Sequence, residues 1–153
     1  MSAPASFRPG SISVLICDDD ESIRDVLTDV IGLRPSLSLA GVAADGNEAI
    51  AEASQLQPDV ILLDLAMPNR TGLGALPELV QVAPRAKIIV LSSLANTSIS
   101  KEVIELGAAL YLEKGASPDQ INDAIETVTV SKATALEPAL ELAGGVDEDS
   151  AGP

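Results

Sequence analysis

The stretch Val60-Ile61-Leu62-Leu63-Asp64-Leu65-Ala66-Met67-Pro68 decides the fold, because it is a short apolar run that ends in one acid. An unbroken run of this length with β-branched residues is typical of a strand buried on both faces of a parallel sheet. A carboxylate at the end of such a strand is costly to desolvate, so it requires a partner or a function. Asp64 is therefore the first candidate functional residue.

Three further apolar runs also end in polar side chains. They are residues 14–17 before Asp18-Asp19-Asp20, residues 88–91 before Ser92-Ser93, and residues 110–113 before Lys114. In an open parallel sheet, the carboxyl ends of the strands line one crevice, where ligands bind at the point at which the strand order reverses. We therefore expect these acids, hydroxyls and the ammonium to lie close together.

Strand-like segments alternate with segments of helical spacing along most of the chain, which predicts a parallel sheet covered by helices on both faces. The predicted strands are near residues 11–17, 37–42, 60–64, 87–91 and 109–112, and the predicted helices are near 21–32, after 46, 72–83, 96–106 and after 117. In the helix at 72–83, Pro77 fits best in the first turn. The expected fold class is α/β, a flavodoxin-like (βα)5 doubly wound sheet with strand order 2-1-3-4-5.

The composition limits the function further. The chain has 153 residues, which suits one domain, and its formal charge of −14 argues against direct binding of nucleic acid. Aromatic residues make up 1% of the chain, so the core must be aliphatic. No apolar stretch is long enough to span a bilayer, and the single Cys17 suits a reducing compartment, so a cytoplasmic protein is expected. We expect a flexible leader at 1–10, one domain at 11–131 and an acidic disordered tail at 132–153.

The predicted strand order places Asp18 and Asp19 beside Asp64. Two unit charges about 4 Å apart repel by about 4 kcal/mol at an effective dielectric constant near 20, so three clustered carboxylates need protons or a cation. Oxygen ligands with room for water suit Mg²⁺. With Lys114 and Ser92 beside them, these groups have the chemistry that transfer of a phosphoryl group to an aspartate requires.

At this point the chain resembles the receiver domains of bacterial two-component response regulators, of the chemotaxis-regulator type. The resemblance covers about residues 11–131. Its motifs are Asp18-Asp19 with Arg24 in the helix that follows, Asp64-x-x-Met67-Pro68-x-x-x-Gly72, Ser92 after the fourth strand, and Tyr111-x-x-Lys114 around the fifth. A stand-alone receiver, signalling through protein contacts and without enzymatic turnover of its own, is the expectation.

The resemblance implies the roles of the acidic residues. Asp64 is the phosphoacceptor. Asp19 and Asp64 ligate Mg²⁺ together with the main-chain carbonyl of Ala66, while Asp18 acts largely through water.

The resemblance also implies how the signal arrives and leaves. A sensor histidine kinase or phosphotransfer protein supplies the phosphoryl group, which Lys114 and Ser92 bind. Ser92 and Tyr111 form the conformational switch. The readout surface is the fourth helix, fifth strand and fifth helix, and this face is also a candidate for a homodimer.

Two alternatives stay open. The family usually has a cis-proline after the lysine, whereas Gly115 follows Lys114 here, so a phosphorylation-independent interaction module of the same fold is one alternative. The other is a phosphatase of the haloacid-dehalogenase type, which needs a second aspartate where Ala66 stands.

Arg24 is interpreted as a surface ion-pair residue of its helix, and Asp20 as a helix cap.

Overall fold

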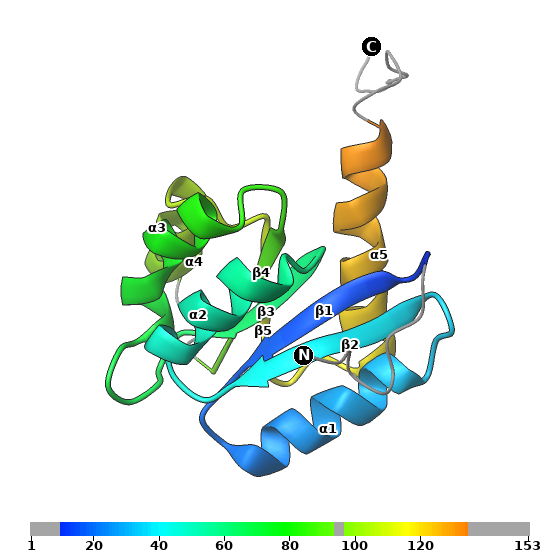
Figure 1. The fold of residues 1–153 in the computed structure, drawn as a ribbon, viewed down its shortest axis with the longest axis horizontal. Helices are drawn as coiled ribbons and strands as arrows, with labels where there is room; N and C mark the ends of the chain where they lie inside the picture. Colours follow the sequence, from blue (N-terminus) through cyan, green and yellow to red (C-terminus); the bar gives the residue numbers. More distant parts are fainter. Residues whose placement is uncertain (1–9, 94–96, 135–153) are drawn as a thin grey trace.

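The computed structural model describes residues 10–93 and 97–134. Residues 1–9 of the predicted leader at 1–10, and residues from 135 onward of the predicted tail at 132–153, therefore lie outside the described residues. The described chain forms one five-stranded parallel sheet with the order β2-β1-β3-β4-β5, which confirms the predicted fold class (Figure 1). The strands are β1 (Ile12–Cys17), β2 (Leu37–Ala43), β3 (Val60–Asp64), β4 (Lys87–Ser92) and β5 (Leu110–Glu113).

Helices cover both faces of this sheet (Figure 1). One face packs against α1 and α5, and the other packs against α2, α3 and α4. The helices are α1 (Glu21–Gly32), α2 (Gly46–Leu56), α3 (Gly72–Val82), α4 (Thr97–Glu105) and α5 (Pro118–Thr134). The central strand β3 is buried along its whole length. Because both of its faces are buried, its sequence is a continuous apolar run up to Asp64 and does not alternate apolar and polar residues.

The buried core of the described residues consists of aliphatic side chains and contains no aromatic ring, as the composition predicts. Leu15 and Ile61 belong to the layer beneath α2, α3 and α4, whereas Val14 and Leu62 belong to the layer beneath α1 and α5. Cys17 is part of the first layer, and burial raises the pKa of its thiol. It therefore stays protonated and packs as a small apolar residue.

Side-chain oxygens cap the N-termini of four described helices, α1, α2, α3 and α5, the last through the Ser117 hydroxyl. The carboxylate of Asp20 accepts a hydrogen bond from the Ser22 N–H at 2.9 Å, which confirms Asp20 as the cap of α1. The Thr71 hydroxyl accepts one from the Gly74 N–H at 2.9 Å. Asp45 caps α2 in the same way.

The helix α3 begins at Gly72 as predicted, but Pro77 does not lie in its first turn. With Thr71 as the cap, Pro77 lies in the helix interior. Proline cannot donate the backbone hydrogen bond of a helix interior, and the helix tolerates this loss because Pro77 is exposed to solvent. In α5, neither proline nor glycine follows Pro118 before Pro138, and the helix continues past residue 131 to Thr134.

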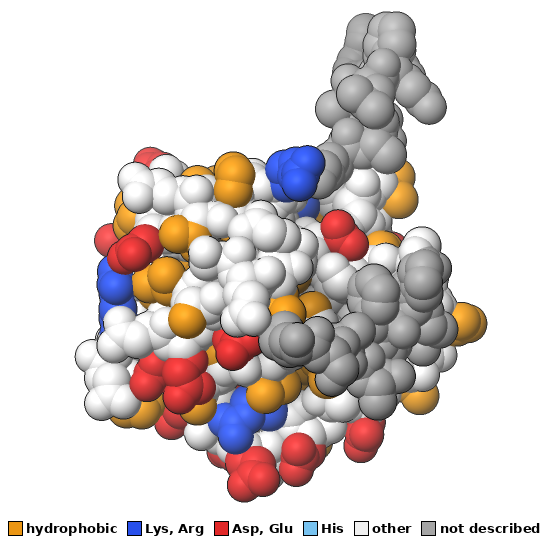
Figure 2. Space-filling view, viewed as in Figure 1, with side chains coloured by type: hydrophobic (Ala, Val, Ile, Leu, Met, Phe, Trp, Pro, Cys, Tyr) orange, Lys and Arg blue, Asp and Glu red, His pale blue; other side chains and the backbone are white. Residues whose placement is uncertain are grey.

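Among the charged side chains, carboxylates outnumber cations, 23 to 9. Figure 2 shows Asp and Glu side chains in several groups, with fewer Lys and Arg, on the face in view. None of the described helices has the length and apolar character needed to cross a membrane.

The connection from β3 to α3 is closed by a tight backbone contact. The Gly72 N–H donates to the Leu65 carbonyl at 2.9 Å, which brings Gly72 over the end of β3. A Cβ atom at this position would lie only 1.9 Å from the Asp64 carbonyl oxygen. Only glycine fits here, which explains why a glycine stands eight positions after the acid that ends β3.

We predict that Gly72→Ala destabilises the protein by about 2–4 kcal/mol, because the backbone at Asp64 must move to admit the methyl group. Gly32→Ala is the matched control, since nothing lies within 4 Å of a Cβ there. Urea unfolding of both variants measures the difference. Equal stability of the two variants would contradict the packing described here.

Candidate functional site

The strand register brings the polar strand ends together. Cys17 pairs with Leu63, so Asp18 and Asp64 follow at the same level of neighbouring strands. Ser92 pairs with Glu113, and the next residue, Lys114, donates its N–H to the Ser92 carbonyl at 3.0 Å. The convergence expected from the sequence is therefore confirmed.

Three carboxylates form a cluster at this edge of the sheet. Asp18, Asp19 and Asp64 each offer an oxygen, and these oxygens all lie within 4.8 Å of one another. Asp18 and Asp64 are buried, with 2% and 5% of their surface exposed, whereas Asp19 faces solvent. The cluster thus has two buried acids beneath one that is open to water.

Lys114 supplies positive charge to the cluster. Its Nζ lies 2.8 Å from Asp18 Oδ2 and 3.4 Å from Asp64 Oδ1. Partial burial lowers the pKa of Lys114, but its hydrogen bond to Asp18 and the charges of Asp64 and Asp18 outweigh that effect and raise the pKa overall. Lys114 is thus charged at neutral pH, and it reaches both acids with a trans peptide bond to Gly115.

For Asp64, the effects that disfavour the charged form outweigh the contacts that favour it, unlike for Lys114. Burial and the neighbouring charge of Asp18 raise the pKa of its carboxyl group, although the Ala66 N–H and Lys114 both favour the charged form. The Ala66 N–H donates to Asp64 Oδ1 at 3.3 Å. The single ammonium of Lys114 therefore compensates only part of the charge of this cluster.

The loop that contains the acidic pair is held in place by contacts to Asp18. The Asp20 N–H donates to Asp18 Oδ1 at 2.9 Å, and Arg24 Nη1 donates to the Asp18 carbonyl oxygen at 2.7 Å. Interpreting Arg24 as a surface ion-pair residue was therefore wrong. Its position one helical turn after the cap Asp20 is the sequence signal that points back toward this loop.

The two proposed switch residues lie on one face of the sheet. Tyr111 pairs with Val90 of β4, and side chains alternate along a strand, so Ser92 and Tyr111 project to the face covered by α4. Ser92 is 2% exposed, whereas Tyr111 is half-buried and lines a surface groove with Lys101 and Ile104 of α4. The Ser92 hydroxyl is thus buried at the end of β4, and the Tyr111 ring lies at the surface groove beside α4.

The donor set fits a hard divalent cation. All three groups are carboxylates, which are the ligands that Mg²⁺ prefers, and Asp19 leaves one side open to water. A divalent ion would also neutralise charge that Lys114 leaves uncompensated. These are the residues that would hold such an ion.

Comparison with known proteins gives the class. The response regulator receiver domain family matches residues 14–126 of this chain. The chain is 34% identical over 116 residues to the chemotaxis protein CheY of Thermotoga maritima, a match that covers 76% of this chain and 96% of that protein. It is 38% identical over 130 residues to the transcriptional regulatory protein LiaR of Bacillus subtilis, covering 85% of this chain and 59% of that protein.

A solved structure agrees with these sequence matches. The signal receiver domain of the response regulator NarL from Mycobacterium tuberculosis superimposes with a TM-score of 0.74 at 25% identity, covering 80% of this chain and 98% of that structure. The chain belongs to the response regulator receiver domain family. Receiver domains are signalling modules of two-component systems.

We predict that Asp64→Asn raises the midpoint of thermal unfolding at pH 7, without metal, by a few degrees. The raised pKa of Asp64 means that the protonated carboxyl favours folding. This contribution is complete below the ordinary carboxyl pKa, near 4, and is lost as the pH rises through the higher value of the folded protein.

The gain should therefore shrink as the pH is lowered toward 4. Asp25→Asn is the control, because Asp25 is an exposed aspartate of α1. A lower unfolding midpoint for Asp64→Asn at pH 7 would contradict the electrostatics described here.

Proposed function

We propose that Asp64 accepts a phosphoryl group from a phosphohistidine of a sensor histidine kinase or a phosphotransfer protein, in a reaction that depends on Mg²⁺. The observation that carries the proposal is the position of the Lys114 ammonium, between the carboxylates of Asp18 and Asp64 at the edge of the sheet. A cation beside a buried, incompletely neutralised carboxylate is suited to hold the anion that arrives there.

In the transfer, a carboxylate oxygen of Asp64 forms a bond to phosphorus while the bond from phosphorus to the imidazole nitrogen breaks. The imidazole keeps the electron pair of that bond and takes up a proton. This chain has no histidine, so the donor must belong to the partner. The chain performs no turnover of a separate substrate in this proposal.

Each neighbouring group has a role in the transfer. Lys114 binds a phosphoryl oxygen, and the Ser92 hydroxyl donates to another. Asp19, Asp64 and the Ala66 carbonyl hold Mg²⁺, with Asp18 acting largely through water. When bound, the ion supplies positive charge for the transferring group.

The switch follows from the added charge. A phosphoryl group on Asp64 brings about −1.5 to −2 charges and new acceptor oxygens next to Ser92. These favour the arrangement in which the hydroxyl turns toward the phosphoryl group, and Tyr111 then moves into the space that Ser92 leaves. The ligand shifts an existing equilibrium between two arrangements.

An apolar depression beside the site suits the docking of the phosphodonor. A cavity of about 110 Å³ lies between α1 and the start of α5 and is lined by Val26, Ile121 and Lys114, among others. Val26 is 56% exposed. A partner helix packed here would bring its phosphohistidine next to Lys114.

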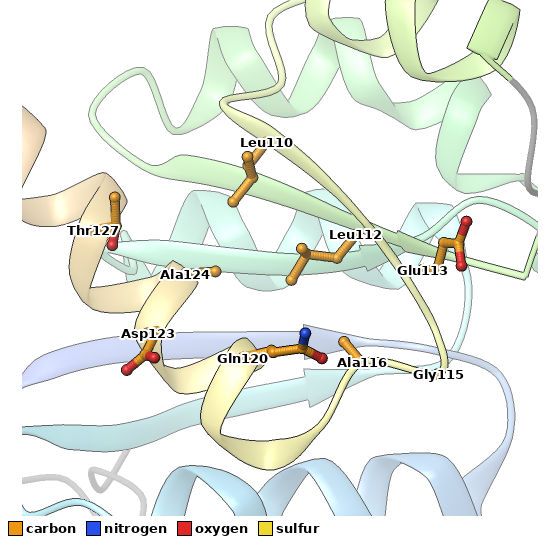
Figure 3. Close-up of a pocket in the computed structure, with 9 residues that line it drawn as sticks. All are labelled: Leu110, Leu112, Glu113, Gly115, Ala116, Gln120, Asp123, Ala124 and Thr127. Atoms are coloured by element: carbon orange, nitrogen blue, oxygen red, sulfur yellow. The ribbon is translucent and has the colours of Figure 1, made fainter.

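A second groove on the same face of the sheet is suited to a downstream partner. Figure 3 shows a groove between β5 and α5, with Leu110 and Leu112 on its floor and Glu113 and Asp123 at its sides. Its volume is about 550 Å³. Because β5 is an edge strand and α5 leaves these leucines only half-covered, the groove offers apolar surface flanked by carboxylates.

The charge of this face favours a cationic protein over a second copy of the chain. The only ammonium on the described side chains of α4, β5 and α5 is that of Lys101. The described carboxylates of these elements are those of Glu102, Glu105, Glu113, Asp119, Asp123 and Glu126. The last three form ion pairs with Arg34, whereas the first three form no ion pair among the described residues. A symmetric dimer would place Glu102, Glu105 and Glu113 of the two copies near one another, which costs free energy.

The chain spans nearly the whole of the chemotaxis protein CheY but about 59% of LiaR. We propose signalling through protein contacts, in the cytoplasm and without direct contact to nucleic acid, since the net charge is −14. A phosphorylation-independent interaction module is the alternative that the following experiment tests. The phosphatase alternative lacks its second aspartate, because Ala66 stands there.

Treatment with acetyl phosphate and Mg²⁺ should add one phosphoryl group to the intact protein, measured by mass spectrometry under acidic conditions that preserve the acyl phosphate. Asp64→Asn should acquire none, because the amide is not a nucleophile of comparable strength. Asp59→Asn is the control and should be modified like the native chain.

An unmodified native chain that still binds Mg²⁺ would favour the phosphorylation-independent module. Modification of Asp64→Asn would place the phosphoacceptor elsewhere.

We also predict that the phosphorylated protein stays monomeric at low ionic strength, because the acids on α4 and β5 repel a second copy. Light scattering coupled to size exclusion measures the mass. A dimer that forms on phosphorylation at low salt would contradict this prediction and support the homodimer through α4, β5 and α5.

A further inference from the structure

The turn between β2 and α2 contains no residue of the site described above, yet it contacts both loops that form it. The carbonyl of Ala43, the last residue of β2, accepts a hydrogen bond from the Asp18 N–H at 3.0 Å. The Gly46 N–H donates to the Arg70 carbonyl at 2.7 Å, in the loop between β3 and α3. The turn therefore connects the loop that contains Asp18 to the loop that follows Asp64.

A side-chain contact reinforces this connection. Asn69 Nδ2 donates to Asp45 Oδ2 at 2.9 Å, while Asp45 Oδ1 accepts from the Glu48 N–H at 2.9 Å and caps α2. The hydrogen bonds from Glu48 and Asn69 lower the pKa of the Asp45 carboxyl group. Asp45 is therefore charged at neutral pH, and hydrogen bonds to a charged acceptor are stronger than neutral ones.

The backbone on both sides is suited to this close approach. Asn69 has a φ of 63°, in the left-handed region that asparagine tolerates better than most residues. A Cβ atom on Gly46 would lie 2.6 Å from the Arg70 carbonyl oxygen. The absence of a side chain at Gly46 and the turn at Asn69 together allow the two loops to touch.

We propose that Asp45, Gly46 and Asn69 are positioning residues that set the affinity of the acidic site for Mg²⁺. They hold the loop that contains Ala66 at a fixed distance from the loop of Asp18 and Asp19. This inference rests on the proposed function, in which the Ala66 carbonyl and these acids are the metal ligands.

The physical reason is preorganisation. Without the Asp45–Asn69 contact, the loop after Asp64 samples more conformations, and metal binding must then pay the entropy of ordering it. The loss of one such hydrogen bond should weaken Mg²⁺ binding by about threefold to tenfold. The fold itself should change little, because Gly72 and Leu65 still close the base of the loop.

The test compares three variants of the full chain by calorimetric titration with Mg²⁺ alone, in the absence of any phosphodonor. Asp45→Ser keeps a residue that caps a helix but no longer reaches Asn69. Asp45→Asn combined with Asn69→Asp exchanges donor and acceptor, so the contact forms again at unchanged net charge. Glu48→Gln removes one charge from the same turn and leaves the contact in place, because the glutamine oxygen can still accept from the Ala44 N–H.

Asp45→Ser should bind Mg²⁺ about threefold to tenfold more weakly than the native chain, while the other two variants stay within about twofold of it. Thermal unfolding without metal should not follow this order. Equal affinities for Asp45→Ser and Glu48→Gln would overturn the inference, and so would an exchanged double variant as weak as Asp45→Ser. Failure of the native chain to bind Mg²⁺ would contradict the proposed function as well, whereas native binding without a loss in Asp45→Ser contradicts only this inference.

Discussion

The site depends on one electrostatic constraint, which is that buried carboxylates at the end of a parallel sheet must be compensated. Asp18 and Asp64 are almost fully buried at neighbouring strand ends, and Lys114 contacts both. One ammonium among three acids leaves the pKa of Asp64 raised. The cluster is therefore prepared for additional positive charge and for an anion that Lys114 can bind, and both requirements are met by phosphoryl transfer with Mg²⁺ as proposed here.

The fold serves this constraint through its strand order. Because β1 and β3 are neighbours while β2 and β4 lie outside them, the crossovers leave to opposite faces and the loops after β1 and β3 meet. Local contacts then determine the geometry. Arg24 and Asp20 hold the Asp18 loop, and Gly72 closes the loop after Asp64.

Much of this arrangement could be predicted from the sequence. Apolar runs indicate the strands, and the residues that directly follow them indicate which side chains lie at the carboxyl edge of the sheet. Asp18, Asp64 and Lys114 were all found in this way. The role of Arg24 was missed because the pattern shows a charged helix position but not the carbonyl that it contacts. Pro77 was misplaced because proline was expected only in a first turn, whereas the helix that begins at Gly72 has it at an exposed interior position. The Asp45–Asn69 contact had no periodic signal at all, since it joins two loops that only the tertiary fold brings together.

The most direct test is a crystal structure with Mg²⁺ and beryllium fluoride, which mimics a phosphoryl group on an aspartate. We predict the fluoride complex on Asp64 in contact with Lys114, and the ion bound by Asp19 and Asp64. An ion bound at a different place, or a fluoride complex that does not involve Asp64, would contradict this prediction.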